Sequence, residues 1–306
     1  MEEGLSRGIT AIEEEFGGHR PDRICISGAG PVDQNRCNLT NVDWVIDGDA
    51  ITEKFGIPTR VINDFTAISY GIPLLDPEDP EQITPVPATD GERPTPHGVV
   101  QAVVGAGTGL GVGYLVEHAG RFVALPSEGG HAAFASYDEL SAELLDFVTH
   151  RDGAVPGAEL FVSGQGIARA FEFYLKTGRI PAGSALQSRS SDDLAADVSA
   201  AAAAGDPTAG EIMRLFVTNY ARVASDAALH FLPTGGLFLA GGIVTKNESW
   251  FLEENRFIRT FTTNYRPHIG GLLCDIPVYI VKDYAISLYG AAHAAYALSM
   301  EDTHNG

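Results

Sequence analysis

The sequence contains little cysteine, little lysine and no long hydrophobic run. Its three cysteines are Cys25, Cys37 and Cys274, and none belongs to a Cys-x-x-Cys pair. This pattern argues against a zinc framework and for a reducing compartment. The longest apolar stretches, such as residues 235–244, are too short to span a bilayer, and no basic segment followed by an apolar core opens the chain. We therefore expect a cytoplasmic protein without a membrane segment or a secretory signal.

Basic residues are also scarce, because 20 Lys and Arg stand against 40 Asp and Glu in a chain of 306 residues, which gives a formal net charge of −20. A field of that sign repels nucleic acid, and no cluster of Lys or Arg interrupts it. We therefore expect no nucleic-acid partner. A high-salt cytoplasm would explain the acidic excess, but a merely acidic surface explains it equally well.

Strand and helix patterns alternate along the chain, which predicts an α/β protein, and the length favours two domains. The Pro-rich and acidic residues 76–97 indicate a surface linker near a domain boundary, and residues 183–208 form either a polar helix or a mobile loop. Expected helices cover 3–16, 49–55, 138–150, 164–177, 211–231 and 286–298, and expected strands cover 23–27, 60–64, 99–104, 111–116, 121–125, 160–162, 236–240 and 276–281.

The most informative motif is Gly105-Ala106-Gly107-Thr108-Gly109-Leu110-Gly111, which directly follows the apolar run 99–104. A strand that ends in such a turn brings backbone N–H groups close to a ligand, glycine permits positive φ there, and phosphate is the commonest ligand for this geometry. The spacing fails the dinucleotide-binding fingerprint, and no lysine follows a glycine as a Walker A loop requires. The alternative interpretation is a tightly packed β-hairpin, because a strand pattern resumes at residue 111.

Two further motifs carry polar groups suited to chemistry. Asn63-Asp64 lies where a strand ends, and a carboxylate there can accept a proton from a substrate hydroxyl, although Asp64 also suits the N-cap of the next helix. Glu128-Gly129-Gly130-His131 places a carboxylate and an imidazole three residues apart. This pair suits a polyol substrate better than a metal ion, because no third ligand cluster accompanies it. The alternative interpretation of the motif is a plain surface loop.

Two weaker signals complete the set of candidates. Glu159 could supply a second carboxylate to the site, although as a single residue it is no stronger a candidate than any other glutamate of the chain. The strand 236–240 runs into Gly241-Gly242, a turn on which an adenosine could lie against the backbone. Close packing of a helix on the strand explains the same two glycines.

The order of these motifs from residue 62 to residue 243 resembles that of bacterial glucokinases, the ATP-dependent type within the actin/hexokinase/Hsp70 superfold. The resemblance covers nearly the whole chain, from Leu5 to the last expected helix, and includes residues 27–31 and 40–44. The related repressor/ORF/kinase family carries a cysteine-rich zinc motif that this chain lacks. The resemblance implies a two-domain ribonuclease H-like fold, with a small domain over 1–98 completed by 284–306 and a large domain over 99–283.

The resemblance also implies an activity, namely phosphoryl transfer from ATP to the 6-hydroxyl of D-glucose at the entry of glycolysis, with Mg²⁺ as cofactor and a homodimer as the usual assembly. It implies that Asp64 is the catalytic base and no residue a metal ligand. The implied glucose ligands are Asn63, Asp64, Glu128, His131 and Glu159, and the implied nucleotide residues are Gly105, Gly107, Thr108, Gly109, Gly241 and Gly242. Three alternatives remain open: the substrate could be another hexose, the phosphoryl donor could be ADP or polyphosphate, and the protein could be a non-catalytic sugar-binding relative.

The chain departs from the family pattern at its start. The family begins with a strand and an Asp-x-Gly-Gly-Thr turn, its first phosphate loop, and then a β-hairpin, whereas position 1 falls at the start of the first expected helix. About three strands of the small domain are therefore expected to be absent, so that this domain is N-terminally truncated. We favour an internal methionine at position 1 over a naturally shortened form.

Overall fold

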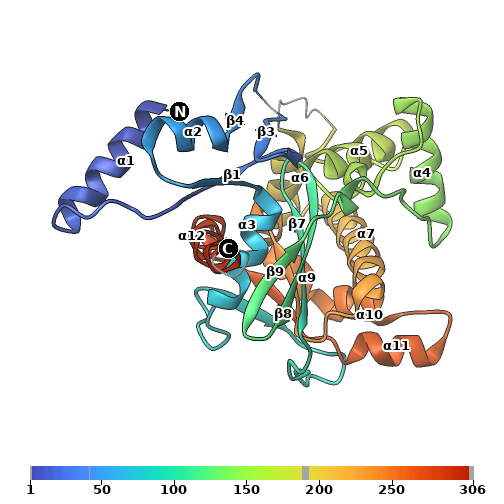
Figure 1. The fold of residues 1–306 in the computed structure, drawn as a ribbon. Coiled ribbons are helices and arrows are strands. Elements are labelled where there is room, and N and C mark those ends of the chain that lie inside the picture. The colour runs from blue at the N-terminus through green and yellow to red at the C-terminus, as the bar shows by residue number, and fades with distance from the viewer. Residues whose placement is uncertain (1, 41, 188–192, 303–306) are drawn as a thin grey trace. The chain divides into compact units, whose positions relative to one another are not determined.

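The structure is a computed structural model that describes residues 2–40, 42–187 and 193–302. The chain forms two compact units, whose helices and strands are labelled in Figure 1. Unit 1 consists of residues 1–75, 117–125 and 285–306, and unit 2 consists of residues 76–116 and 126–284. Because these units are defined by contacts alone, the domain boundaries at residues 98 and 284 stay a prediction.

Unit 1 contains a parallel pair of strands, β1 (Ile24–Gly28) and β5 (Thr59–Asn63), in which Gly28 lies opposite Asn63. A small antiparallel sheet of β2 (Val32–Asp33), β3 (Arg36–Asn38) and β4 (Val45–Asp47) lies between them in the sequence. The other elements of this unit are α1 (Glu2–Glu15), α2 (Gly48–Phe55), α3 (Asp64–Gly71), the 3₁₀ turn η1 (Ile72–Leu74), β9 (Arg121–Leu125) and α12 (Ile286–Asp302). A core of Cys37, Ile46, Ile51 and Val61 joins the small sheet to α2 and β5.

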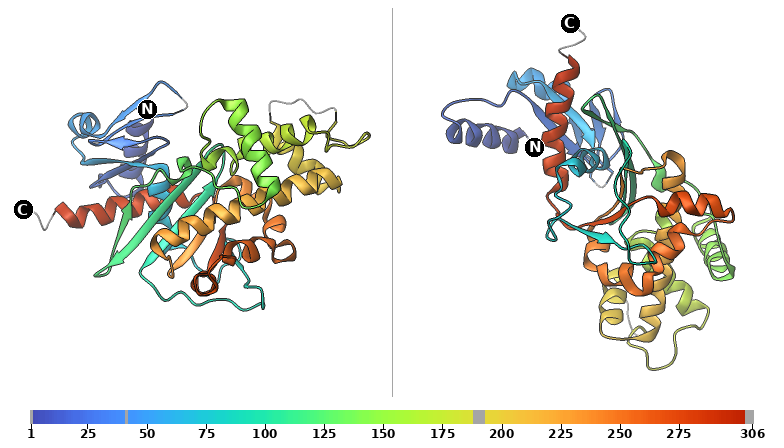
Figure 2. Two further views of the ribbon diagram at one scale, coloured as in Figure 1. Left: turned by 90° about the vertical axis from the view of Figure 1, so that its right-hand side faces the viewer. Right: turned by 90° about the horizontal axis from the view of Figure 1, so that it is seen from below.

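Helices α3 and α12 lie side by side in unit 1 although more than 200 positions separate them in the sequence (Figures 1 and 2). Their backbones approach closely at two glycines: a Cβ on Gly290 would overlap the carbonyl oxygen of Ala67, and one on Gly71 would overlap that of Ile286. The ring nitrogen Nδ1 of His293 lies 2.7 Å from the carbonyl oxygen of Tyr70. The last helix thus supports the helix that begins at Asp64.

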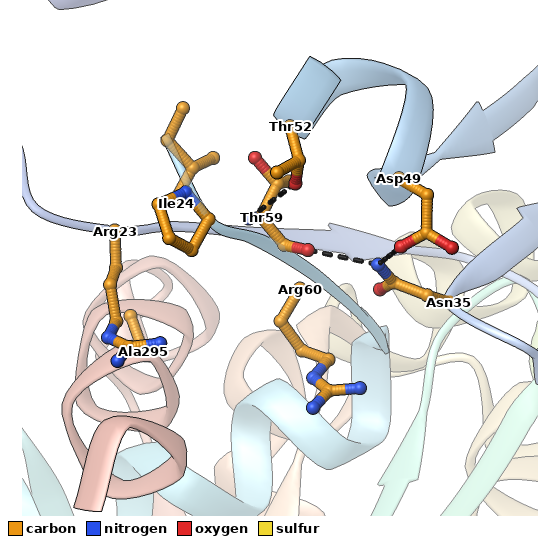
Figure 3. A pocket seen from close by; sticks show the side chains of 9 residues that line it. Arg23, Ile24, Asn35, Asp49, Thr52, Thr59, Arg60 and Ala295 are labelled. Atoms are coloured by element: carbon orange, nitrogen blue, oxygen red, sulfur yellow. Dashed lines mark hydrogen bonds between the residues drawn. The ribbon is translucent and has the colours of Figure 1, made fainter. Parts of the chain in front are cut away.

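A hollow in unit 1 lies over β1 and β5 and is lined by Arg23, Arg60, Asn35 and Asp49 among others (Figure 3). Its polar contacts are structural, because Nδ2 of Asn35 donates to Oδ1 of Asp49 at 2.7 Å and to the carbonyl oxygen of Thr59 at 3.0 Å. Oδ1 of Asn35 accepts from the backbone N–H of Val61 at 2.8 Å. The Asn35 amide therefore bonds the outer edge of β5 as a neighbouring strand would.

Unit 2 contains five strands ordered β6-β11-β10-β7-β8, namely β6 (Ile83–Val86), β11 (Val278–Val281), β10 (Gly236–Ala240), β7 (Val100–Ala106) and β8 (Leu110–His118). The long helix α7 (Pro207–Phe231) packs on β7 (Figures 1 and 2). Oη of Tyr220 on α7 donates to the carbonyl oxygen of Val104 at 2.6 Å, beneath the turn that follows β7. Burial raises the pKa of Tyr220 far above its ordinary value, so this hydroxyl stays a donor.

The remaining helices of unit 2 are α4 (Glu139–Asp152), α5 (Gly164–Lys176), α6 (Leu194–Ala203), α8 (Gly242–Lys246), α9 (Glu248–Leu252), α10 (Arg256–Thr262) and α11 (Pro267–Cys274), with 3₁₀ turns η2 (Gly129–His131), η3 (Ala158–Leu160) and η4 (Glu253–Asn255). Residues 183–208 were expected to be either a polar helix or a mobile loop, and the structure has helix α6 at 194–203. Residues 188–192 lie outside the described residues.

Two sequence predictions of secondary structure are wrong. Residues 83–86, expected within a linker, form β6, an edge strand paired antiparallel with β11, and Pro85 is tolerated there because an edge strand has one unpaired side. Residues 160–162 are not a strand, because Leu160 ends the 3₁₀ turn η3 and Phe161 and Val162 follow it. Phe161 and Val162 are buried there by packing, which is why their apolar run resembles a strand.

Candidate active site

In unit 1, Asn63 ends β5 and caps α3. Its Oδ1 accepts from the backbone N–H groups of Phe65 at 2.8 Å and Thr66 at 3.4 Å, while its Nδ2 donates to the carbonyl oxygen of Gly30 at 3.0 Å. The sequence left the N-cap open to Asp64, but the structure assigns it to Asn63. Asn63 thereby fixes both the start of the helix and the neighbouring turn.

Asp64 is the first residue of α3 and is half-buried. Its Oδ1 accepts from the backbone N–H of Phe65 at 3.0 Å. The partial positive charge of a helix N-terminus stabilises a carboxylate in this position. The strand, the Asn63 cap and the helix therefore hold the Asp64 carboxylate in a fixed orientation, which a general base requires.

In unit 2, the glycine motif forms the tight connection between β7 and β8, with Gly105 opposite Gly111 and Ala106 opposite Leu110. The backbone N–H of Gly107 donates to the carbonyl oxygen of Gly109 at 2.8 Å. In the described part of the chain, the N–H groups of Thr108 and Gly109 donate to no protein acceptor. The motif is thus a β-hairpin, as the alternative interpretation had it, and also presents two open backbone donors.

None of the glycines between residues 105 and 111 has a positive φ. A Cβ on Gly109 would overlap Oε2 of Glu159. The sequence argument from left-handed backbone is therefore wrong at these positions, whereas its argument from close approach holds at Gly109.

Three other segments of unit 2 pack against the same loop. Gly241, with φ of 98°, lies so close to the carbonyl oxygen of Ala106 that a Cβ would overlap it, and a Cβ on Gly130 would overlap the carbonyl oxygen of Leu110. The N–H of Gly164 donates to the carbonyl oxygen of Gly107 at 2.9 Å. Motifs that lie far apart in the sequence thus meet at one loop.

Glu159 lies in η3 and is half-buried beside the loop. Its Oε2 accepts from the backbone N–H of Leu110 at 2.9 Å. Its carbonyl oxygen accepts from Oγ of Ser163 at 2.7 Å. Of the two carboxylate oxygens, Oε1 accepts no hydrogen bond within the described residues and can therefore take a ligand hydroxyl.

Glu128 and His131 project from η2 with side chains that are each 66 % exposed, and Oε2 of Glu128 lies 3.8 Å from Nε2 of His131. A carboxylate accepts hydrogen bonds and an imidazole both donates and accepts, so the pair matches neighbouring hydroxyls of a polyol. No group of three or more His, Cys, Asp or Glu among the described residues could hold a metal ion. The donor and acceptor groups of the pair suit a hydroxyl-rich ligand.

Sequence reasoning missed the groups that hold these side chains. The Leu110 amide carries no side-chain signal, and Tyr220 is one of many buried aromatic residues on its helix. Ser163 was open to detection, because a serine before a glycine-rich helix start indicates an N-cap, and its Oγ does accept from the N–H of Gly166 at 3.2 Å.

Comparisons with known proteins show the family to which the chain belongs. The glucokinase family model matches residues 5–298. The chain is 34 % identical over 295 residues to the glucokinase of Nostoc punctiforme, covering 91 % of this chain and 83 % of that protein. It is 29 % identical to the crystal structure of glucokinase from an Antarctic psychrotroph, with a TM-score of 0.78 over 95 % of this chain and 85 % of that one.

A more distant structure shows the fold alone. It is that of a ROK family glucokinase from Streptomyces griseus in complex with glucose and AMPPNP, with a TM-score of 0.61 at 22 % identity over 96 % of this chain and 88 % of that one. The α/β architecture and these neighbours place the chain among sugar kinases of the actin/hexokinase-like fold. Within that class, the chain belongs to the glucokinase family.

Proposed function

We propose that the chain is a glucokinase that transfers the γ-phosphoryl group of ATP to the 6-hydroxyl of D-glucose and yields glucose 6-phosphate. The observation that carries this proposal is the convergence of three glycine-containing segments of unit 2 on the loop of residues 105–111, together with three side chains of the same unit that suit sugar hydroxyls. The family relationship supports the same reaction.

Each proposed glucose ligand offers the polar group that a sugar hydroxyl needs. In unit 2, Glu128 and His131 are open to solvent and Glu159 presents Oε1. In unit 1, Asn63 and Asp64 stand at the end of β5. Sites built to bond a hydroxyl reject analogues that lack it, so this set predicts selectivity for the hydroxyl pattern of the hexose.

The nucleotide residues fit a phosphate chain and an adenosine. The open N–H groups of Thr108 and Gly109 suit phosphate oxygens, as backbone donors of a glycine-rich turn do. A Cβ on Gly242 would contact only the ring of Tyr284, at 3.7 Å, so the turn after β10 leaves space for a flat group. Mg²⁺ would be held by phosphate oxygens of the nucleotide and by water, and when bound it would neutralise charge on the transferring phosphoryl group.

The chain's own residues then act mainly by orientation. Asp64 accepts the proton of the 6-hydroxyl as that oxygen attacks the γ-phosphorus, and the bond from phosphorus to the bridging oxygen breaks. Asn63 keeps Asp64 at the helix start through its three hydrogen bonds.

We also propose a cytoplasmic homodimer that serves the entry of glycolysis. No helix in the described part of the chain is long and apolar enough to cross a membrane. The assembly is testable by light scattering on the purified protein, where about twice the monomer mass of 32.5 kDa is expected.

A coupled assay with Mg²⁺ tests the activity and its selectivity together. We expect ATP-dependent formation of glucose 6-phosphate and at least tenfold lower kcat/KM for mannose and galactose, and for ADP or polyphosphate as donor. Binding of glucose in calorimetry without turnover of any donor would contradict the kinase and favour the sugar-binding relative. Preference for a different hexose would correct the substrate but keep the reaction.

A further inference from the structure

The carboxylate of Glu159 bonds the backbone of the glycine loop. Its Oε2 accepts the N–H of Leu110 at 2.9 Å, directly after Thr108 and Gly109, whose own N–H groups are the open donors of the loop. Because Gly107 and Gly109 close the turn through a bond of 2.8 Å, fixing Leu110 at one end also fixes the orientation of these two donors.

The approach of Glu159 to the loop depends on the glycine at 109. A Cβ on Gly109 would overlap Oε2 of Glu159 and displace the carboxylate from the Leu110 amide. A Cβ on Gly107, two residues earlier, would have no heavy atom within 4 Å. The two glycines therefore offer a matched pair, since one substitution disturbs the Glu159 contact and the other does not.

The segment around Glu159 is tied to the loop at a second point. The N–H of Gly164 donates to the carbonyl oxygen of Gly107 at 2.9 Å, and Oγ of Ser163 donates to the carbonyl oxygen of Glu159 at 2.7 Å. The turn from Glu159 to Gly164 thus holds both ends of the loop's tip. Such a double attachment favours one geometry of the open donors over others.

We propose that Glu159 is a positioning residue for the phosphate-binding loop in addition to being a glucose ligand, so that sugar and nucleotide binding are coupled through one carboxylate. This inference rests on the proposed function. A hydroxyl on Oε1 restricts the rotation of the carboxylate, and the Leu110 amide and the two open donors are restricted with it. Coupling through binding is reciprocal, so the nucleotide strengthens sugar binding by the same factor.

Hydrogen exchange at the Leu110 amide tests the positioning role without any activity. In Glu159→Ala we expect this amide to exchange about fivefold faster, the effect of about 1 kcal/mol for one hydrogen bond. Glu159→Gln keeps an acceptor oxygen and should exchange nearly as the wild type does. Glu128→Ala is the matched control, because Glu128 is a proposed sugar ligand with no contact to this amide, and it should leave the exchange unchanged.

Titration with the ATP analogue AMPPNP in the absence of sugar tests the coupling. The dissociation constant should rise about fivefold in Glu159→Ala and in Gly109→Ala, and stay near the wild-type value in Glu159→Gln and Glu128→Ala. If Glu159→Ala does not fold, Gly109→Ala and Glu159→Gln carry the same comparison.

Unchanged Leu110 exchange and unchanged AMPPNP affinity in Glu159→Ala, together with weaker glucose binding, would overturn the inference and leave Glu159 as a sugar ligand alone. If the wild type binds no AMPPNP, the proposed donor is wrong, and the coupling is wrong with it. In that case the Leu110 exchange in Glu159→Ala and Gly109→Ala still upholds or overturns the positioning role, so the two failures are distinguishable.

Discussion

The end of β5 in unit 1 and the glycine loop in unit 2 hold their candidate groups by different means. In unit 1, one side chain, that of Asn63, makes the three hydrogen bonds that fix the turn before Asp64. In unit 2, backbone segments touch each other directly, because glycines at 130 and 241 leave no Cβ between them. The first arrangement fails when a polar atom is removed, and the second fails when a carbon atom is added.

The largest effect is expected from Gly130→Ala. The added Cβ meets a backbone oxygen, that of Leu110, which cannot rotate away, so we expect a loss of about 3 kcal/mol or more in the free energy of unfolding. Urea denaturation measures it. Gly107→Ala is the matched control and should stay within about 1 kcal/mol of the wild type, because its Cβ has free space and its φ is not positive. Equal losses in both variants would contradict packing as the reason for the glycines.

A smaller effect is expected from Asn63→Ala, which removes the cap of α3 and the bond to Gly30. We expect a loss of about 2 kcal/mol in the free energy of unfolding. Asn63→Asp keeps the capping oxygen and loses only the donor to Gly30, so it should lose about half as much. Stability of Asn63→Ala equal to that of the wild type would show that side-chain bonds do not fix this turn.

A third prediction contrasts the Asn63 cap with the carboxylate cap of α7. The pKa of Asp206 is lowered, chiefly by the backbone N–H of Ala209, with Ser184, Ala185 and Thr208 also donating to it. Because the folded pKa lies below the unfolded one, the stabilisation is complete above the unfolded pKa, near 3.9, and is lost as the pH falls through the folded pKa. Asp206→Ala should therefore cost about 1 kcal/mol at pH 7 and less below about pH 4.

Urea denaturation of the wild type and Asp206→Ala measures the difference in their free energies of unfolding, which we expect to be smaller at pH 3 than at pH 7. Asn63→Ala is the control, since an amide does not titrate and its stability difference should not narrow in the same way. A constant difference for Asp206→Ala across this range would contradict a charged cap.

The smallest effect on stability concerns the cysteines. Burial raises the pKa of Cys25 to about 11, and Cys37 is fully buried, whereas Cys274 is exposed. Since the thiolate is the reactive form, iodoacetamide at pH 8 should modify Cys274 first in the folded protein, with no measurable change in unfolding. Peptide mass spectrometry after short exposure identifies the site, and earlier modification of Cys25 would show that unit 1 opens readily.

Most of the local structure could be predicted from the sequence. The helix from Gly48 to Phe55, the strands around the glycine loop and the long helix α7 all carry clear periodicity or strong start and stop signals. Strand β6 could not be predicted in this way, because its pairing with β11 joins residues nearly 200 positions apart. The apolar run at 160–162 was wrongly predicted to be a strand, because its residues are buried by tertiary packing and not by strand pairing.

The candidate site likewise combines features that could be predicted from local sequence with features that could not. The sequence identified which residue types carry chemistry, but the roles of the supporting residues depend on distances between remote segments. The contact of Glu159 with Leu110 joins positions 49 apart, and the close approach of Gly241 to Ala106 joins positions still farther apart. The N-cap shows that even a local choice between two adjacent polar residues, Asn63 and Asp64, is settled only in the folded chain, where Asn63 also donates to the carbonyl oxygen of Gly30.

The most direct test of the central claim is the turnover of Asp64→Asn with glucose, ATP and Mg²⁺, measured beside its calorimetric affinity for glucose. The variant keeps an oxygen for hydrogen bonding but cannot accept the proton, so we expect kcat to fall by about 10² to 10⁴-fold with a change in glucose Kd below about tenfold. Asp49→Asn, another carboxylate of unit 1, should retain wild-type turnover. Wild-type kcat in Asp64→Asn would contradict the assignment of Asp64 as the base of a sugar kinase.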